Sequence, residues 1–600
     1  MLPYSPWLAW FVPIIGCLLV PILAKINGKL RGWFSFLFVA ISSVFTFSML
    51  PDVFNGYLAD VQVRWIPYFN LSVGVLVDPL SVFMASLVSF IGALILLYSI
   101  GYMAHEEGLT RYYFFMLLFI GGMIGLIMAD NFVQLYIFWE IVGLCSYALI
   151  GFWYKKPEAV RAGMKAFIVT RVGDVCLLLG ILILYFNTGQ FAFSSIQNSA
   201  GFLSMSLLTT VMLLLFGGAI GKSAQVPLFV WLPDAMEGPT TVSALIHAAT
   251  MVKAGVYLVA RTATIFPSLS SDYLLVVAGV GAVTAFMAAT MALATFDIKR
   301  VLAYSTISQI GYMMFALGLG TSGGWFASQF HLMSHALFKA LLFLCAGAVI
   351  HITGTRDMRQ MGGLRRYMPI TYATFIIGAL SLSAVPPFNG FWSKDLILEE
   401  CFRLGGYTGY LLFFAGTLTA IITIAYAIRA VALTFLGHES TVLKDKKLRE
   451  APSVMTIPLI ILASACVISG FLQPSFANLM SQMFPKIADL SIMNIEVLPL
   501  SISLLALVVG GLPAYMVYVK RSVSPEALTR GSLSRGVYKL LVNGYYFDSF
   551  YNYVFVKGTV YISNKLRKLQ TGILNVNMLA FLIGFLFLLG LLFSALQGGI

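Results

Sequence analysis

Long apolar stretches recur along almost the whole chain, and each is close to the length of a membrane-spanning helix. Such a helix needs about 20 mostly apolar residues, and the sequence holds about 16 candidates. Their starts lie near Pro6, Trp33, Leu76, Tyr112, Phe132, Gly163, Phe202, Thr241, Tyr273, Val301, Trp325, Ile370, Thr408, Ser453, Leu498 and Met578. Little sequence remains for a water-soluble domain, so we predict an all-α, multi-pass membrane protein.

The composition leads to the same class of protein. The chain is 60% hydrophobic and 10% charged, and its mean hydropathy of +0.91 is far above that of soluble proteins. The net charge of +13 could indicate a nucleic-acid partner, but the basic residues lie in short loops between the predicted spans and form no single patch. We therefore expect lipids and membrane proteins as partners, and no nucleic acid.

The loop charges also predict an orientation. If the N-terminus lies outside, the inside loops carry most of the basic residues, as the positive-inside rule requires. These residues are Lys25, Lys29, Arg31, Lys155, Lys156, Arg161, Lys299, Arg300, Arg356, Arg359, Arg365, Arg366, Lys444, Lys446, Lys447 and Arg449. The alternate loops carry little more than Arg64, Arg261, Arg403 and Lys486. Because no basic segment precedes the first apolar stretch, we expect that stretch to be a retained helix rather than a cleaved signal peptide.

The sequence contains no pattern that indicates a redox or nucleotide cofactor. Its six cysteines are scattered, without the CxxC spacing of metal or redox sites. It also lacks the glycine-rich motifs that bind dinucleotides or phosphates. We therefore expect no cofactor in this chain, and we expect any electron transfer to take place in partner proteins.

Two of the predicted spans are interrupted by prolines. GKSAQVPLFVWLPD contains Pro227 and Pro233, which cannot donate a helix hydrogen bond and should unwind the span inside the membrane. SAVPPFNGFWSK repeats the pattern at Pro386 and Pro387, followed by Gly390. In our count the breaks fall in spans an odd number of crossings apart, so they have opposite orientations, as in inverted-repeat transporters. The alternative is a chance recurrence of prolines, which are common in membrane helices.

Charged residues inside the spans are the strongest indication of function. Such a charge costs at least about 2.5 to 3.5 kcal/mol on insertion scales, so it implies a partner, a cavity or a function. Glu140 has no basic neighbour in sequence, so its counter-charge must come from another helix. Lys222 precedes a further mostly apolar stretch, which places it inside the membrane. The alternatives are a structural polar contact for Glu140 and snorkelling to the interface for Lys222.

Titratable residues continue through the later spans. His247 and Lys253 are six residues apart, so a continuous helix would turn them toward different neighbours. His331, His335 and Lys339 recur at i, i+4 and i+8 and form one polar stripe, which is what a proton path across an apolar helix requires. The alternatives are a structural histidine at 247 and a zinc site at the HxxxH pair, for which no third ligand is near in sequence.

Two further pairs complete the set. Arg171 and Asp174 are three residues apart and could form a structural ion pair or take part in function; Lys394 and Asp395 follow the second break, where Lys394 could instead lie at the interface. The residues we predict for a proton pathway are Glu140, Lys222, His247, Lys253, His331, His335, Lys339 and Lys394, with Arg171, Asp174 and Asp395 as modulating neighbours.

A polar and aromatic segment follows the span that ends near Lys520 and precedes one last apolar stretch. It is too polar to cross a bilayer and too rich in apolar side chains for disorder, so we predict a helix lying along the interface or along a partner. About 30 helical residues from Phe547 would reach about 45 Å.

These features resemble one known family, the large distal antiporter-like subunit of respiratory complex I (NADH:quinone oxidoreductase) and its relatives. The similarity is carried by FWEIVGLCSYALIGFWY, GKSAQVPLFVWLPDAMEGPTTVSALIHAATMVKAGVYLVAR, HLMSHALFKALLFL and PPFNGFWSKD, and it covers nearly the whole chain. It implies two inverted five-helix repeats, each with a broken helix and a half-channel for protons, then a lateral helix and an anchor helix. The functional residues it implies are a key pair of Glu140 and Lys222, a polar site at His247, a central Lys339, Lys394 near the exit and a modulatory Asp174.

The resemblance divides the chain into six regions. We expect N-terminal helices in 1–110, the first repeat in 111–262, the second repeat in 273–436, additional helices in 437–520, the lateral amphipathic segment in 521–576 and the terminal anchor in 577–600. Two features depart from the family. Lys253 stands where a small polar residue is more usual, and the lateral segment looks shorter than in bacterial relatives.

The resulting hypothesis is proton translocation driven by electron transfer in partner subunits that carry flavin and iron-sulfur clusters. The protein would lie in the inner or cell membrane of a prokaryote, or in an organellar inner membrane. One alternative is a subunit of a multi-subunit sodium/proton antiporter, or of a deazaflavin-dependent, ferredoxin-dependent or hydrogenase-type relative. Another is a metal-dependent membrane enzyme built on His331 and His335. The sequence leaves open whether His247 or Lys253 links the two halves.

Overall fold

The computed structural model describes residues 1–69, 71–199, 201, 203–266, 268–443, 448–489, 496–525, 530–568, 572 and 574–597. Phe202, Lys444, Lys446 and Lys447, which entered the sequence arguments, lie outside these ranges. The chain forms two compact units, Met1–Tyr538 and Lys539–Ile600. We call them unit 1 and unit 2 and describe each by itself.

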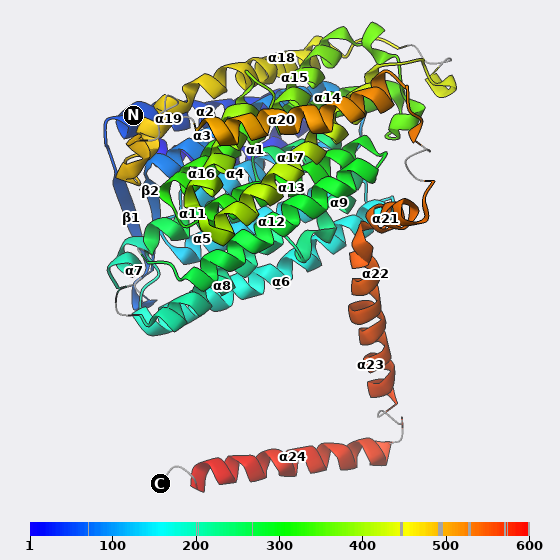
Figure 1. The fold of residues 1–600 in the computed structure, drawn as a ribbon. Coiled ribbons are helices and arrows are strands. Elements are labelled where there is room, and N and C mark those ends of the chain that lie inside the picture. Colours follow the sequence, from blue (N-terminus) through cyan, green and yellow to red (C-terminus); the bar gives the residue numbers. More distant parts are fainter. Residues whose placement is uncertain are drawn as a thin grey trace. The chain divides into compact units, whose positions relative to one another are not determined.

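Unit 1 is a bundle of closely packed helices (Figure 1). Its long helices are α1 (Ser5–Ile26), α2 (Arg31–Phe54), α3 (Pro79–Tyr102), α4 (Leu109–Ile127), α5 (Phe132–Ile150), α6 (Pro157–Thr188), α8 (Met205–Lys222), α12 (Ser271–Ala294), α13 (Ile298–Gly318), α14 (Ser322–Thr353), α17 (Gly406–Phe435), α18 (Ser453–Ile468) and α20 (Val497–Ala514). Its shorter helices are α7 (Phe193–Ser199), α9 (Trp231–Asp234), α10 (Thr240–Ala248), α11 (Met251–Ile265), α15 (Pro369–Leu382), α16 (Asn389–Leu404) and α19 (Gln473–Met480).

The predicted multi-pass, all-helical class is confirmed. Across the described residues of both units, 15 helical segments are long and apolar enough to cross a membrane, and α15 is a shorter apolar helix. Several helices begin at the residue types that cap helices. The Asp78 side chain, for example, accepts a hydrogen bond from the Ser81 amide, and the Asp78 amide donates one to the Ser81 hydroxyl oxygen. The total number of crossings and the inverted repeats stay predictions.

A β-hairpin between α2 and α3 was not predicted. Strands β1 (Ala59–Ile66) and β2 (Leu71–Val77) pair antiparallel, with Ala59 opposite Val77. The first turn of α5 binds the second strand, since the Gln134 side chain exchanges two hydrogen bonds with the backbone of Gly74 at 2.8 and 2.9 Å. The end of unit 1 that carries the hairpin is called the hairpin side below, and the opposite end is called the loop side.

The two proline-containing segments break their helices in the same way. α8 ends at Lys222 and α15 ends at Leu382, and after each the backbone turns through a left-handed alanine, Ala224 (φ 51°) and Ala384 (φ 59°). The Gln225 amide then donates to the Ile220 carbonyl and the Val385 amide to the Leu380 carbonyl, both at 3.0 Å. Two non-glycine residues in this uncommon conformation make chance recurrence a poor explanation of the sequence similarity.

Unit 2 contains helices α22 (Phe547–Tyr551), α23 (Gly558–Arg567) and α24 (Leu574–Gln597), with a π-helical stretch, Asn552–Lys557, between the first two. The described helical path from Phe547 runs to Arg567, and the expected length of about 30 residues also depends on residues 569–571 and 573, which lie outside the described part of the chain. Helix α21 (Ser532–Val542) precedes it. Because α24 is apolar and none of its spanning window is buried within unit 2, it needs an apolar environment outside that unit.

Candidate functional site

The basic and imidazole side chains predicted for a proton pathway are buried in unit 1. The exposed fraction is at most 1% for Lys222, His247, Lys253, His331, His335, Lys339 and Lys394. Asp174 is also fully buried, whereas Glu140 is partly exposed. Groups of this kind are costly in an apolar bundle, so the contacts that hold each of them define what the site can do.

Lys222 lies at the last position of α8, next to the first break, and faces Asp174 of α6. The distance from Lys222 Nζ to Asp174 Oδ2 is 3.4 Å, and both side chains are 1% exposed. Trp139 Nε1 donates a hydrogen bond to Asp174 Oδ1 at 2.6 Å. Glu140 is held instead by Arg171 on α6.

Two expectations about this cluster therefore change. The resemblance pairs Glu140 with Lys222, but the carboxylate in ion-pair contact with Lys222 is Asp174. Arg171 is mainly the counter-charge of Glu140, and its Nη1 is 4.0 Å from Asp174 Oδ2. Arg171 thus links Glu140 to Asp174, and two cations and two carboxylates alternate along one chain of contacts.

Glycines let the three helices of this cluster approach closely. A Cβ at Gly143 of α5 would overlap Lys222 Nζ. A Cβ at Gly173 of α6 would lie 2.7 Å from the Gly217 carbonyl and 3.1 Å from Gly221 Cα, both on α8. At Gly173 the neighbours are backbone, so only glycine fits there without moving a helix, and this packing sets the distance between Asp174 and Lys222; at Gly143 a side chain would displace the Lys222 ammonium group instead.

His247 and Lys253 lie on different helices, because α10 ends at Ala248 and α11 begins at Met251. The assumption of one continuous helix was wrong, although the two side chains do face different neighbours. Lys253 Nζ contacts His335 Nδ1 of α14. His247 lies against the ring of Phe343, 4.7 Å between ring centroids, and neither ring nitrogen has a hydrogen-bond partner among the described residues.

The predicted stripe His331, His335 and Lys339 lies on the single helix α14. His331 is hydrogen-bonded at 3.0 Å to Gln309 of α13 through Nε2 and at 3.0 Å to Ser393 of α16 through Nδ1. Lys339 Nζ donates to the Leu302 carbonyl at 3.2 Å and to Ser305. The stripe therefore faces α11, α13 and α16.

Lys394 lies in α16, after the second break. Its Nζ is 4.7 Å from the centroid of the Tyr312 ring and has no hydrogen-bond partner among the described residues. Ser393, its neighbour, contacts His331. Asp395 is 8% exposed, and its Oδ1 also lacks a partner in the described part of the chain. Buried amines and carboxylates without hydrogen-bond partners are costly, so Lys394 and Asp395 stand out as polar groups of this region.

Most of the predicted residues form polar clusters inside unit 1. One cluster surrounds Lys222, a second joins Lys253 to His335, and the remaining members of the stripe extend it to Ser305 and Ser393. Such an arrangement can take up a proton, hold it in a dry environment and pass it between groups linked by hydrogen bonds and water.

Comparison with known proteins decides the family. The family described as NADH:quinone oxidoreductase/Mrp antiporter, TM, matches residues 129–423, and that described as NADH-Ubiquinone oxidoreductase (complex I), chain 5 N-terminus, matches residues 65–113. The chain is 40% identical to NAD(P)H-quinone oxidoreductase chain 5 of Picosynechococcus over 95% of its own length and 91% of that protein. The chain belongs to this antiporter-like family.

Other relatives come from different complexes. F(420)H(2) dehydrogenase subunit L of Methanosarcina mazei is 41% identical over 85% of this chain and 86% of its own. A chain of the Mrp complex from Dietzia matches with a TM-score of 0.82 and 27% identity over 98% of this chain, which spans 63% of that one. A chain of an archaeal membrane-bound sulfane sulfur reductase matches with a TM-score of 0.81 and 25% identity over 98% of this chain and 100% of that one.

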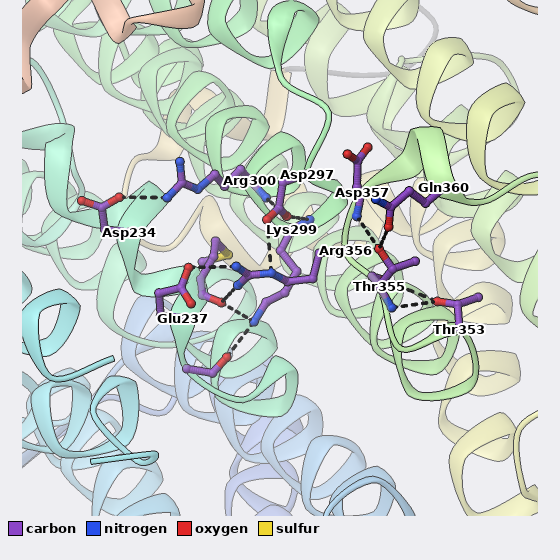
Figure 2. A network of polar contacts seen from close by, with 12 residues as sticks. Asp234, Glu237, Asp297, Lys299, Arg300, Thr353, Thr355, Arg356, Asp357 and Gln360 are labelled. Atoms are coloured by element: carbon purple, nitrogen blue, oxygen red, sulfur yellow. Dashed lines mark hydrogen bonds and ion pairs between the residues drawn. The ribbon is translucent and has the colours of Figure 1, made fainter. Parts of the chain in front are cut away.

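The antiporter-family chain also has a polar network on the loop side (Figure 2). Arg356 pairs with Glu237 at 2.9 Å and with Asp297 at 3.3 Å. Lys299 donates to the carbonyls of Met236 and Gly238 at 2.7 and 2.6 Å. The network ties the segment after the first break to the start of α13.

Sequence reasoning missed several polar residues of this antiporter-like chain. Trp139 and Ser305 contact the predicted groups directly, but aromatic and hydroxyl side chains in an apolar run carry no signal by themselves. Arg261 was assigned to a loop and is in fact buried in α11, paired with Asp78. Among the described residues no group of three His, Cys, Asp or Glu side chains could hold a metal ion.

Proposed function

We propose that this chain is a proton-translocating membrane subunit of a complex I-type oxidoreductase. The observation that carries the proposal is Lys222, fully buried beside the break in α8 and held there by Asp174. A lysine at a helix break, facing a carboxylate on another helix, is a group whose proton can be held or released by small changes in the position of its partner.

The order of the groups suggests the steps. Lys222 holds a proton while Asp174 is close, with Glu140 and Arg171 as the adjacent pair. A displacement of these charges, driven by electron transfer in partner subunits, weakens the hold, and the proton moves toward His247, Lys253 and the stripe on α14. Lys394 exchanges the proton with the far side. In this scheme the contact with His335 favours Lys253 as the link between the halves.

The proposal includes the surroundings of the chain. The N-terminus and the hairpin side face the outer side of a prokaryotic or organellar inner membrane, as the loop charges indicate. Flavin and iron-sulfur clusters belong to partner subunits. Residues 111–262 and 273–436 form two inverted repeats, an assignment that the similar breaks support. The exposed helical segment from Phe547 to Arg567 contacts neighbouring membrane subunits.

A sodium/proton antiporter subunit is the second candidate. The similarity to a chain of the Mrp complex, with a TM-score of 0.82, favours it. This chain spans only 63% of the Mrp chain, whereas it covers 91% of the quinone oxidoreductase subunit, and we therefore prefer the redox-driven function. A subunit of a deazaflavin-dependent, ferredoxin-dependent or hydrogenase-type relative is the other alternative.

The test measures protons pumped and electrons transferred by the purified complex in sealed vesicles. Lys222→Met and Glu140→Gln are expected to reduce the number of protons pumped per electron. Lys155→Met is the matched control, because Lys155 pairs with Glu107 in an exposed loop contact. Undiminished pumping by Lys222→Met at normal electron flow would reject the proposal. Pumping that requires sodium and no electron donor would favour the antiporter.

A further inference from the structure

A second polar stripe runs along α11 from Lys253 toward the hairpin side. Lys253, Tyr257 and Arg261 follow at i, i+4 and i+8, so their side chains share one face over about 12 Å of helix. All three are buried. Tyr257 donates to the Ile127 carbonyl at 2.5 Å and accepts a hydrogen bond from Arg261 Nε at 3.1 Å. The stripe connects the centre of the bundle, where Lys253 contacts His335, with one surface of unit 1.

Beyond Arg261 the structure has a cavity of about 440 Å³ that opens on the hairpin side. Exposed side chains at its rim include Asp60 and Gln197, whereas Asp78, Asp130 and Arg261 in its wall are buried. A cavity of this size with polar walls holds water. Water from outside unit 1 therefore reaches Arg261, but the stripe behind Arg261 is closed.

The ion pair between Arg261 and Asp78 closes the stripe on α11 to water from the cavity. Arg261 Nη1 and Nη2 donate to the two oxygens of Asp78 at 2.5 and 3.0 Å. Asp78 is fixed as the N-cap of α3, where it accepts the Ser81 amide at 2.8 Å. A guanidinium group fixed between the cavity and Tyr257 repels hydronium, as in membrane pores that exclude protons. Removal of this charge would open a polar route from the cavity to Tyr257.

Asp130, between α4 and α5, supplies an exchange group in the same cavity. It is 1% exposed; its Oδ1 accepts a hydrogen bond from Asn131 at 2.6 Å, and Oδ2 has no donor among the described residues. Gly74 of β2 makes room for the carboxylate, because a Cβ there would overlap it. Burial, with a further contribution from Asp60, raises the pKa of Asp130 to about 6. The carboxyl group therefore gains and loses a proton in the range of physiological pH.

We propose that this cavity is a second site of proton release, closed by the Asp78–Arg261 pair and served by the carboxylate of Asp130. The inference rests on the proposed function. When Arg261 moves from Asp78 into the cavity, the ammonium group of Lys253 gives its proton to water beside Tyr257. The hydronium passes it to Asp130 Oδ2, and water at the rim then takes it from Asp130. The charged groups that face Asp130 in the cavity are Asp60, Asp78 and Arg261, and the two other carboxylates favour arrival of a cation.

The experiment uses the complete complex in sealed vesicles and follows the pH gradient after the electron donor is exhausted. With Arg261→Met the gradient is expected to collapse faster, by roughly tenfold, which corresponds to about 1.4 kcal/mol of barrier. Arg261→Lys keeps the positive charge, so its pH gradient should collapse nearly as slowly as that of the unmodified complex. Arg359→Met is the control, because Arg359 is exposed and pairs only with Asp357 among the ion pairs of the described chain.

Two further variants make the result decisive. Asp78→Asn combined with Arg261→Met removes the ion pair without leaving an unpaired buried charge. The collapse of the pH gradient is measured on this double variant if Arg261→Met alone does not fold. Adding Asp130→Asn to the leaky variant should slow the collapse and flatten its dependence on pH between about 5 and 7.

The outcomes separate the two proposals. A folded double variant as tight to protons as the unmodified complex overturns the release site, even if Lys222→Met abolishes pumping. Normal pumping by Lys222→Met overturns the proposed function, whatever the leak measurements give. A leak that Asp130→Asn leaves unchanged overturns the role of Asp130.

Discussion

At the scale of single residues, Lys222 belongs to a balanced group of charges. Asp174 offsets the cost of burying its ammonium group, and Asp174 also takes the hydrogen bond of Trp139. Arg171 and Glu140 form the neighbouring pair, with Arg171 within 4.0 Å of Asp174. Because two cations and two carboxylates alternate, the loss of one proton unbalances both pairs at once.

Removal of the Trp139 hydrogen bond tests this balance. Trp139→Phe keeps the aromatic packing but leaves Asp174 Oδ1 without its 2.6 Å donor. The loss of a hydrogen bond to a buried charged group costs about 1.5 to 3 kcal/mol, and we expect slower proton pumping at unchanged protein yield. Trp153→Phe is the control, because Trp153 donates to Glu106 in a loop contact. Equal pumping rates for the two variants would remove Trp139 from the site.

The sequence identified the charged members of this group but not their pairing. Glu140 and Lys222 stand out in apolar runs, so composition alone marks them. The sequence suggested an ion pair between Asp174 and Arg171, three residues away. Its partner Lys222 comes from α8 and its hydrogen-bond donor from α5, and the contact of these helices depends on glycines whose role only the packing reveals.

At the scale of elements, close packing of α6 on α8 sets the geometry of the site. Gly173 and Gly221 face each other across the contact, and a Cβ at Gly173 would lie 3.1 Å from Gly221 Cα. The neighbour in this contact is backbone, which cannot rotate away. A methyl group would therefore push the helices apart and lengthen the Asp174 to Lys222 distance.

We expect Gly173→Ala to lower both stability and pumping. Overpacking of this kind costs about 1 to 3 kcal/mol, so the temperature of thermal unfolding of the purified complex should fall. Gly279→Ala is the matched control, since Gly279 lies in another long apolar helix and a Cβ there has nothing within 4 Å. A variant at Gly173 that keeps the unfolding temperature and the pumping rate of Gly279→Ala would contradict the packing argument.

Some elements could not be predicted from the sequence for physical reasons. Prolines marked the breaks after α8 and α15, but the interruption between α10 and α11 at Ala249 and Thr250 contains neither proline nor glycine. The hairpin strand Leu71–Val77 is so apolar that the sequence did not separate it from the start of the next predicted span, which the structure shows as α3. Continuous apolar character cannot distinguish a buried strand from the first turns of a helix.

At the scale of the whole molecule, the two units differ in how they are stabilised. Unit 1 contains every predicted site residue and a large buried core. In unit 2, by contrast, no side chain described between Lys539 and Ser594 is buried. Apolar residues such as Phe555 and Tyr561 have no core within unit 2 to enter, so unit 2 depends on contacts outside itself for their burial.

A chain that ends at Tyr538 tests this division. Because the core and the Lys222 site lie within unit 1, we expect the shortened chain to insert and to unfold at nearly the same temperature as the full chain in detergent. It should fail to co-purify with the other membrane subunits, since the exposed helices that would contact them are missing. A second chain ending at Lys568 keeps α22 and α23 and loses only α24, so it should retain part of the association. If the chain ending at Tyr538 co-purifies as well as the full chain, unit 2 is not the attachment segment.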